Sequence, residues 1–146
     1  KGVISVLSRL LADEILLYQK LRNYHWNVVG LNFKTLHELF EEHYEDVGKI
    51  ADQVAERIRA NGSPAAGTLA EAKEKSRLVE VPVNYPKSNE MLVELKVDNE
   101  NMVSYLWRDA KIISEEYHDK ASEDLIISIM QKHLMMAWML RSMEVQ

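Results

Sequence analysis

Apolar residues recur at three- and four-residue spacing along four long stretches of this sequence: about residues 3–29, 34–61, 89–118 and 122–145. This spacing places apolar side chains along one face of an α-helix, and that face must be buried against other helices. Gly30 and Gly62 follow the first two stretches, where a glycine commonly ends a helix. The chain is therefore predicted to be all-α.

The connections between the four helices predict how they are arranged. The first and third connections are short, so each joins two antiparallel neighbours, whereas the second spans residues 62–88 and contains all three prolines. A connection of that length lets the second and third helices run parallel. Within it, Thr68 and Glu71 have the spacing of a capping box, which predicts a short helix. We therefore expect one domain, residues 1–146, with a ferritin-like four-helix bundle and one long crossover connection carrying a short helix.

Composition and charge exclude several classes of function. The formal net charge of −5 disfavours non-specific binding to nucleic acid or anionic lipid. The chain has no cysteine, which excludes thiolate metal sites, disulfides and cysteine nucleophiles. Its longest apolar run, residues 134–140, is too short to cross a bilayer. We expect a cytoplasmic protein that does not associate with membranes.

The second helix carries a polar face in addition to its apolar stripe. This face contains His37, Glu41, Asp52 and Glu56, which lie roughly 100–200° around the helix from Leu36. His37 and Glu41 are four residues apart, as are Asp52 and Glu56, so each pair consists of neighbouring side chains of metal-ligand type. A solvated helix face is the alternative interpretation.

The positions of these two pairs are palindromic along the second helix. Their centres lie fifteen residues apart, about 22 Å at 1.5 Å per residue, so one metal ion cannot contact both pairs of one helix. Two copies packed antiparallel about a two-fold axis would place His37 opposite the partner's Glu56, and Glu41 opposite the partner's Asp52. Gly48 lies near the midpoint on the same face, where we expect two helices to approach closely.

His25 completes this candidate site. The first two helices form a hairpin that turns near Leu31, so His25, six residues before the turn, is predicted to lie level with His37, six residues after it. Each site would then combine two imidazoles and a carboxylate from one subunit with two carboxylates from its partner. Nitrogen and oxygen ligands without sulfur suit Fe(II), Zn(II) or Mn(II), and the carboxylate-rich set favours two iron ions.

Residues 25–58, HWNVVGLNFKTLHELFEEHYEDVGKIADQVAERI, resemble the signature of the Dps family, the mini-ferritins named for DNA protection in starved cells. The resemblance extends more loosely over nearly the whole chain, including KHLMMAWMLRS at residues 132–142. It implies a dodecameric hollow shell built from two-fold dimers, with a ferroxidase centre at each dimer two-fold. The family's ligand pattern falls on His25, His37, Glu41, Asp52 and Glu56. Glu41 departs from that pattern, because this position is commonly an aspartate, one methylene shorter.

The resemblance also implies an activity. Two Fe(II) ions are oxidised at a di-iron centre shared between two subunits, in many members preferentially by hydrogen peroxide rather than oxygen, and Fe(III) is stored as mineral inside the shell. We therefore expect a ferroxidase and iron-storage protein that protects against oxidative damage. By the same likeness, Tyr24 and Trp26 could trap stray oxidising equivalents, or could be interface aromatics. Asp119 and Asp124 either line an acidic iron-entry pore or belong to the start of a helix.

Two other functions are consistent with these residues. The main alternative is a nucleoid DNA-binding structural protein with a secondary metal site. Many relatives bind DNA through a lysine-rich terminal tail, whereas this chain starts with KGVISVLSR, so we do not expect it to bind DNA. The third function is a zinc-stabilised dimer without oxidation chemistry.

The remaining histidines and methionines are interpreted as structural. Glu115 and His118 match half of the motif used inside ordinary ferritin-like bundles, but the sequence has no second copy, so His118 is expected to be a cation near a helix C-terminus. His43 lies on the apolar stripe and is expected to be hydrogen-bonded in the core, while Glu14 and His133 have no assigned role. The methionines near the C-terminus are expected to be adaptable packing residues rather than metal ligands: Met130, Met135, Met136, Met139 and Met143.

Overall fold

The structure is a computed structural model that describes residues 1–145, and these residues contain five helices and no strand. The helices are α1 (Gly2–Asn27), α2 (Phe33–Ala60), α3 (Leu69–Lys75), α4 (Ser88–Tyr117) and α5 (Lys120–Met143). Four are long and α3 is short, which confirms the predicted ferritin-like bundle with a short helix in its crossover. None of the described helices is both long enough and apolar enough to span a membrane.

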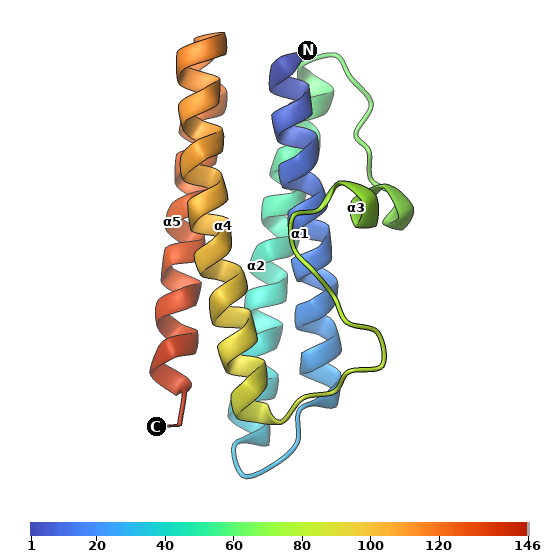
Figure 1. Ribbon diagram of the computed structural model, residues 1–146, viewed down its shortest axis with the longest axis vertical. Coiled ribbons are helices and arrows are strands. Elements are labelled where there is room, and N and C mark those ends of the chain that lie inside the picture. Colours follow the sequence, from blue (N-terminus) through green and yellow to red (C-terminus); the bar gives the residue numbers. More distant parts are fainter. Residues whose placement is uncertain (146) are drawn as a thin grey trace.

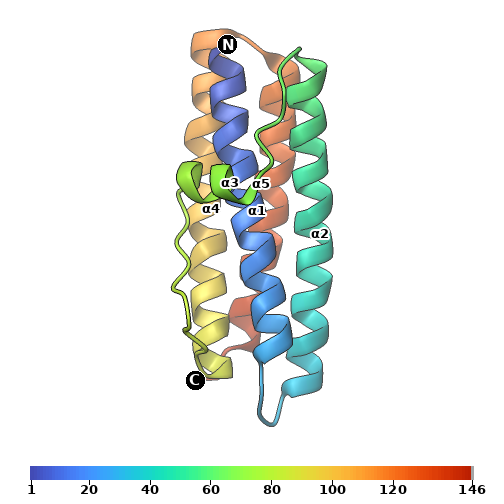
Figure 2. The same ribbon diagram turned by 90° about the vertical axis from the view of Figure 1, so that its right-hand side faces the viewer.

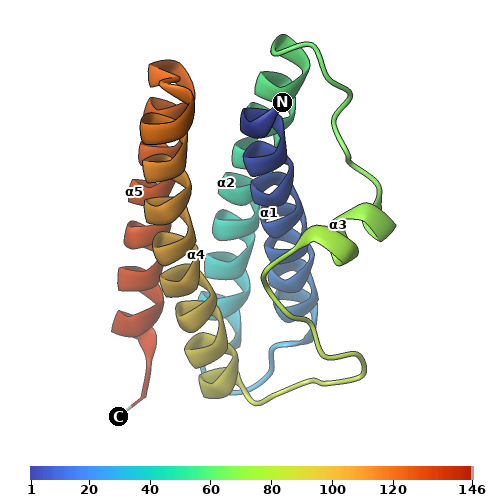
Figure 3. The same ribbon diagram turned by 45° about the horizontal axis from the view of Figure 1, so that its top comes forward.

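The four long helices lie side by side along one axis (Figure 1). Helix α1 runs antiparallel to α2, and α4 runs antiparallel to α5, while α2 and α4 run parallel, as the connection lengths predict. The crossover passes over the outer side of α1, and α3 lies across α1 near the middle of the bundle (Figure 2). The view tilted by 45° shows α3 outside the bundle of the four long helices (Figure 3).

Local sequence explains where several helices begin and end. Gly30 and Gly62 follow α1 and α2 with φ values of 116° and 92°, conformations that glycine adopts without steric cost. Helix α3 begins with the predicted capping box, in which the Thr68 hydroxyl accepts from the Glu71 backbone N–H. The Glu71 carboxylate in turn accepts from the Thr68 backbone N–H. These local signals mark the ends of α1 and α2 and the start of α3.

The predicted apolar stripe of α2 forms the centre of the core. All six of its residues are at most 1% exposed: Leu36, Phe40, Val47, Ile50, Val54 and Ile58. They pack in one cluster with apolar residues of α1, α4 and α5. Because burial of apolar surface is the main favourable term in folding, this stripe fixes the rotation of α2 and so the direction of its polar face.

Arg77 joins the crossover to the bundle. Its guanidinium donates two hydrogen bonds to the Asp109 carboxylate on α4, at 3.0 and 2.9 Å, and one at 2.8 Å to Asp13 on α1. The Arg77 backbone N–H and the Ser76 hydroxyl also donate to Asp13. Both carboxylates are buried, so this charged cluster holds the segment after α3 against two helices at once.

A polar network inside the bundle gives Glu14 and His133 the structural role that the sequence did not assign. Glu14, Asn99 and His133 come from α1, α4 and α5, and each has an exposed fraction of 0%. Nε2 of His133 lies 2.7 Å from a Glu14 carboxylate oxygen, and its Nδ1 lies 2.7 Å from the Asn99 amide oxygen. The Asn99 amide nitrogen donates to the Leu95 carbonyl, which leaves its oxygen to accept from His133. The network therefore pairs buried polar groups from three helices.

His43 departs from the prediction. It lies on the buried face of α2 and is 2% exposed, but neither ring nitrogen has a hydrogen-bond partner within residues 1–145. The expectation that His43 is hydrogen-bonded in the core is therefore wrong. Burial lowers the pKa of His43 from 6.5 to about 4, so the folded protein holds a neutral imidazole at this position.

Candidate metal centre

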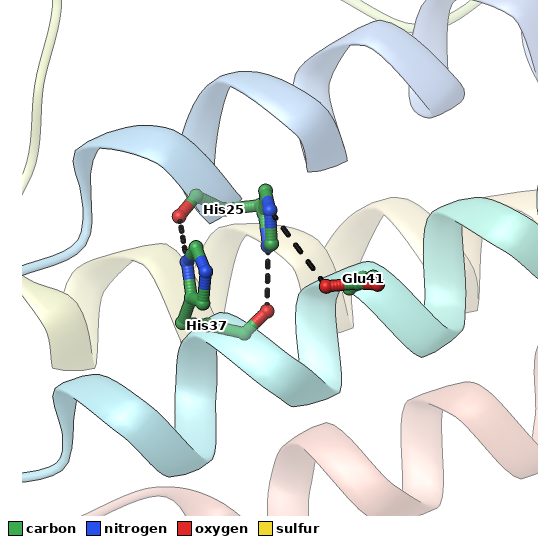
Figure 4. A group of neighbouring side chains, drawn as sticks. All are labelled: His25, His37 and Glu41. Carbon is green, nitrogen blue, oxygen red and sulfur yellow. Dashed lines mark hydrogen bonds and ion pairs between the residues drawn. The ribbon is translucent and has the colours of Figure 1, made fainter.

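The α1–α2 hairpin brings His25 and His37 together. His25 lies in the last turn of α1, and His37 lies near the start of α2, level with it as expected from their equal distance to the turn. Their rings stack with centroids 3.8 Å apart and an angle of 13° between the ring planes (Figure 4). Two imidazoles from the two arms of the hairpin thus form one unit.

Reciprocal hydrogen bonds orient these two rings. Nδ1 of His25 donates to the His37 backbone carbonyl at 2.6 Å, and Nδ1 of His37 donates to the His25 carbonyl at 2.7 Å (Figure 4). A carbonyl oxygen can only accept, so each Nδ1 must carry a proton. The lone pair of each neutral ring is therefore on Nε2, the nitrogen that remains available to a metal ion.

Glu41 places a carboxylate beside the two rings. It follows His37 by one helical turn, and its Oε1 lies 3.9 Å from Nε2 of His25 (Figure 4). One ligand atom from each of His25, His37 and Glu41 lies within 4.8 Å of the other two. His25 is buried, whereas His37 and Glu41 are half-buried, so a metal ion can reach this cluster from the surface.

Two aromatic side chains that the sequence analysis did not single out pack on the histidine pair. Phe33 stacks on His37 with ring centroids 5.0 Å apart, and Tyr44 meets His25 edge-on at 5.3 Å. Phe33 precedes His37 by four residues and Tyr44 follows it by seven, a spacing that places all three on one face of α2. This spacing is the feature of the sequence from which the two aromatic neighbours could have been predicted. Their packing restricts rotation of both imidazoles.

Asp52 and Glu56 lie elsewhere in the same chain. They are exposed on α2, eleven and fifteen residues beyond Glu41, which corresponds to about 16 and 22 Å along the helix. One subunit therefore brings together His25, His37 and Glu41, and holds Asp52 and Glu56 too far away to join them.

Gly48 lies between these two groups of ligands. A Cβ at this position would meet Cε1 of Tyr18 at 3.1 Å, so the packing of α1 on α2 within one chain explains the glycine. Close approach of two subunits, the expected explanation, is not required. Tyr18, Gly48 and Asp52 line an open surface hollow of about 420 Å³ beside the cluster.

The two aromatic candidates next to His25 have different environments. Trp26 is 56% exposed, and the Arg22 guanidinium lies 4.9 Å from the centre of its ring. Tyr24 is buried and donates a 2.6 Å hydrogen bond to Glu94 on α4. Burial and this bond to Glu94 raise the pKa of Tyr24. Tyr24 therefore belongs to the core of the bundle, and Trp26 to its surface.

The acidic candidates near the α4–α5 turn lie at the opposite end of the bundle. Asp119 caps α5 by accepting from the Ser122 backbone N–H, which is the helix-start role. Asp124 is exposed one turn further along α5. Glu115 and His118 are also exposed, so neither points into the bundle as a di-iron ligand would. His118 is the C-cap residue of α4.

The donor set of the hairpin cluster defines what it can bind. Two neutral imidazole nitrogens and one carboxylate oxygen, without sulfur, suit divalent first-row metal ions such as Fe(II), Zn(II) and Mn(II). Three protein ligands leave coordination positions open. A metal ion bound here can therefore take further ligands.

Comparisons with known proteins agree with the four-helix fold. Residues 4–144 match the ferritin-like domain family Ferritin. The chain is 37% identical over 145 residues to DNA protection during starvation protein 2 of Bacillus anthracis, and the alignment covers 97% of this chain and 96% of that protein. It is 36% identical over 142 residues to an uncharacterized low temperature-induced protein of Nostoc sp., covering 97% of this chain and 79% of that protein. The crystal structure of Dps from Staphylococcus aureus superposes with a TM-score of 0.91 at 34% identity, covering 99% of this chain and 95% of that one.

Proposed function

Because this chain belongs to the Dps family of ferritin-like proteins, we propose that it is a ferroxidase that oxidises Fe(II) and stores the Fe(III) produced. Membership places it among iron-storage mini-ferritins linked to DNA protection. The observation that best supports a ferroxidase centre is the pair of reciprocal hydrogen bonds between His25 and His37. It directs two Nε2 lone pairs to the same side as the Glu41 carboxylate, which suits them to bind Fe(II).

The proposed centre is completed by a second subunit. Asp52 and Glu56 are exposed on the same helix as His37 and Glu41 but about 16 to 28 Å from them along α2. Antiparallel pairing of two α2 helices about a two-fold axis brings each exposed pair to the partner's histidines. The centre then contains two imidazoles and three carboxylates, and each dimer contains two such centres.

The ligand types suit oxidation of two iron ions. The neutral Nε2 atoms of His25 and His37 bind Fe(II), and three carboxylates supply negative charge that favours Fe(III) over Fe(II). Carboxylates can bridge two ions, so the centre is proposed to hold two. Each Fe(II) gives one electron and hydrogen peroxide accepts two, so 2 Fe(II), H₂O₂ and 2 H⁺ yield 2 Fe(III) and 2 H₂O. This stoichiometry consumes peroxide without releasing hydroxyl radical.

The same proposal extends to assembly. We infer a homo-oligomer, with the two-fold dimer as its unit and a dodecameric hollow shell as the complete form, in which the mineral is stored within the cytoplasm. The family relationship supports this assembly, and so does the incomplete ligand set of one subunit. Oxygen is the alternative oxidant to hydrogen peroxide.

The proposal is tested by loading the assembled protein with Fe(II) anaerobically, adding hydrogen peroxide or oxygen, and following Fe(III) absorbance. We expect about two Fe(II) oxidised per peroxide, with no hydroxyl radical detected by a spin trap. His37→Ala should lose the rapid rise in Fe(III) absorbance that follows addition of the oxidant. Glu38→Ala, which alters an exposed neighbour outside the cluster, should keep it. Unchanged rapid oxidation in His37→Ala would show that the hairpin cluster is not the centre.

A further inference from the structure

A second candidate metal pocket lies between α2 and α5. It has a volume of about 210 Å³, and His43 lines it together with three methionines of α5: Met135, Met136 and Met139. His43 is about 200° around α2 from Glu41, so this pocket opens on the opposite side of the helix from the hairpin cluster. The two sites are therefore separate.

The His43 side chain at this pocket is buried without a hydrogen-bond partner. His43 is 2% exposed, and both ring nitrogens lack a hydrogen-bond partner among the described residues. A buried polar group without a partner costs free energy, whereas an apolar side chain of similar size at this position would not. A bound metal ion would give the imidazole the partner that the protein does not supply.

The methionines lie at different depths in the pocket. Met136 is 4% exposed and as buried as His43, Met139 is half-buried, and Met135 is 57% exposed. Met136 and Met139 are three residues apart, so their thioethers lie on one face of α5. The chain has no cysteine, and these thioethers are therefore the soft ligands available beside an imidazole.

The rim of the pocket carries a negative balance of charge. Glu42 and Asp46 are exposed one turn apart on α2, and Lys132 is exposed opposite them on α5. Two carboxylates against one ammonium favour the approach of a cation over that of an anion.

We propose that this pocket binds one monovalent copper ion, with a His43 ring nitrogen and the thioether sulfurs of Met136 and Met139 as ligands. Thioethers are soft ligands that select Cu(I), whereas Fe(II) and Mn(II) prefer imidazole and carboxylate. The hairpin cluster, which has no sulfur, and this pocket therefore take different metals.

The test is a competition for Cu(I) between the assembled protein and a chromophoric Cu(I) chelator without oxygen. The wild type should retain one Cu(I) per chain, and X-ray absorption at the copper edge should show sulfur and nitrogen ligands. His43→Leu should lose this binding, and Met136→Leu and Met139→Leu should each weaken it by about tenfold or more. Met102→Leu, a buried methionine of α4 outside the pocket, is the matched control and should bind as the wild type does.

Two further measurements keep the outcome unambiguous. His43→Leu removes an unpaired buried polar group, so its melting temperature should rise, which separates loss of copper from loss of fold. The double variant His25→Ala/His37→Ala should retain Cu(I). If His43→Leu held Cu(I) as tightly as the wild type, or if the absorption spectrum showed only nitrogen and oxygen ligands, the pocket would not be a copper site.

Discussion

His25 and His37 exchange hydrogen bonds across the α1–α2 hairpin, each ring donating from Nδ1 to the other residue's backbone carbonyl, at 2.6 and 2.7 Å. The same two contacts do two things. They join the C-terminal turn of α1 to the start of α2, and they leave both Nε2 atoms free to bind a metal ion. Stability of the hairpin and the proposed affinity for iron therefore depend on the same pair of side chains.

Substitutions at His37 should separate these two effects. In His37→Asn the amide nitrogen occupies the place of Nδ1, so the bond to the His25 carbonyl is kept and the metal ligand is lost. In His37→Ala both are lost. We expect His37→Ala to be about 1 kcal/mol less stable than His37→Asn in urea unfolding of metal-free protein. Both should bind Fe(II) at least about tenfold more weakly in anaerobic calorimetry. Equal stability of the two variants would show that the reciprocal hydrogen bonds do not stabilise the hairpin.

Arg77 should contribute strongly to stability although it lies in the crossover. Arg77→Ala leaves the buried carboxylates of Asp13 and Asp109 without their main partner, and such a loss typically costs about 3–5 kcal/mol. Arg77→Lys keeps the charge but cannot make the two-point contact with Asp109, so its stability should be intermediate. Urea unfolding at one protein concentration measures both. If neither differed from wild type, the Arg77 cluster would not anchor the crossover.

His43 should make stability depend on pH between about 4 and 6.5. Burial lowers its pKa from 6.5 to about 4, so within this range the unfolded chain binds more protons than the folded one. The free energy of unfolding should therefore have its full value above pH 6.5. It should fall by up to about 3 kcal/mol as the pH is lowered toward 4. The comparison of wild type with His43→Leu, unfolded in urea at each pH without metal, isolates this contribution. Parallel curves for the two proteins would contradict it.

DNA binding should be weak for a protein of these 146 residues. Its net charge of −5 opposes contact with phosphates, which supply most non-specific affinity for DNA. In a gel-shift assay at physiological salt, we expect no retardation of duplex DNA by the assembled protein. A clear shift that disappears at higher salt would reveal a basic surface that the net charge conceals.

Periodic and local features of the fold were predictable from the sequence. The apolar stripe of α2 is buried as its spacing predicts, and the Thr68–Glu71 capping box starts α3. The pairing of His25 with His37 was predictable because both residues are equally far from a short turn. These predictions rest on residues a few positions apart, or on a hairpin whose geometry leaves little choice.

Contacts between distant residues were not predictable. Glu14 and His133 are 119 residues apart, and Arg77 and Asp13 are 64 apart, so no local pattern links either pair. A helical wheel placed His43 on the buried face of α2, but it could not show that both ring nitrogens lack partners. The roles of Asp52 and Glu56 depend on a second subunit, and they remain predictions.

Each proposed centre takes ligands from two subunits, and mixing two inactive variants tests this most directly. The first variant, His37→Ala, keeps Asp52 and Glu56. The second, Asp52→Ala/Glu56→Ala, keeps His25, His37 and Glu41. In a dimer of either variant alone, every shared site lacks at least one ligand. The variants are unfolded, mixed and reassembled, with reassembled wild type as the control. Half of randomly paired dimers are mixed, and each mixed dimer has one complete site of two, so ferroxidase activity should return to about a quarter of the wild-type level. If verified mixed dimers stayed inactive while reassembled wild type was active, the centre would not be shared between subunits.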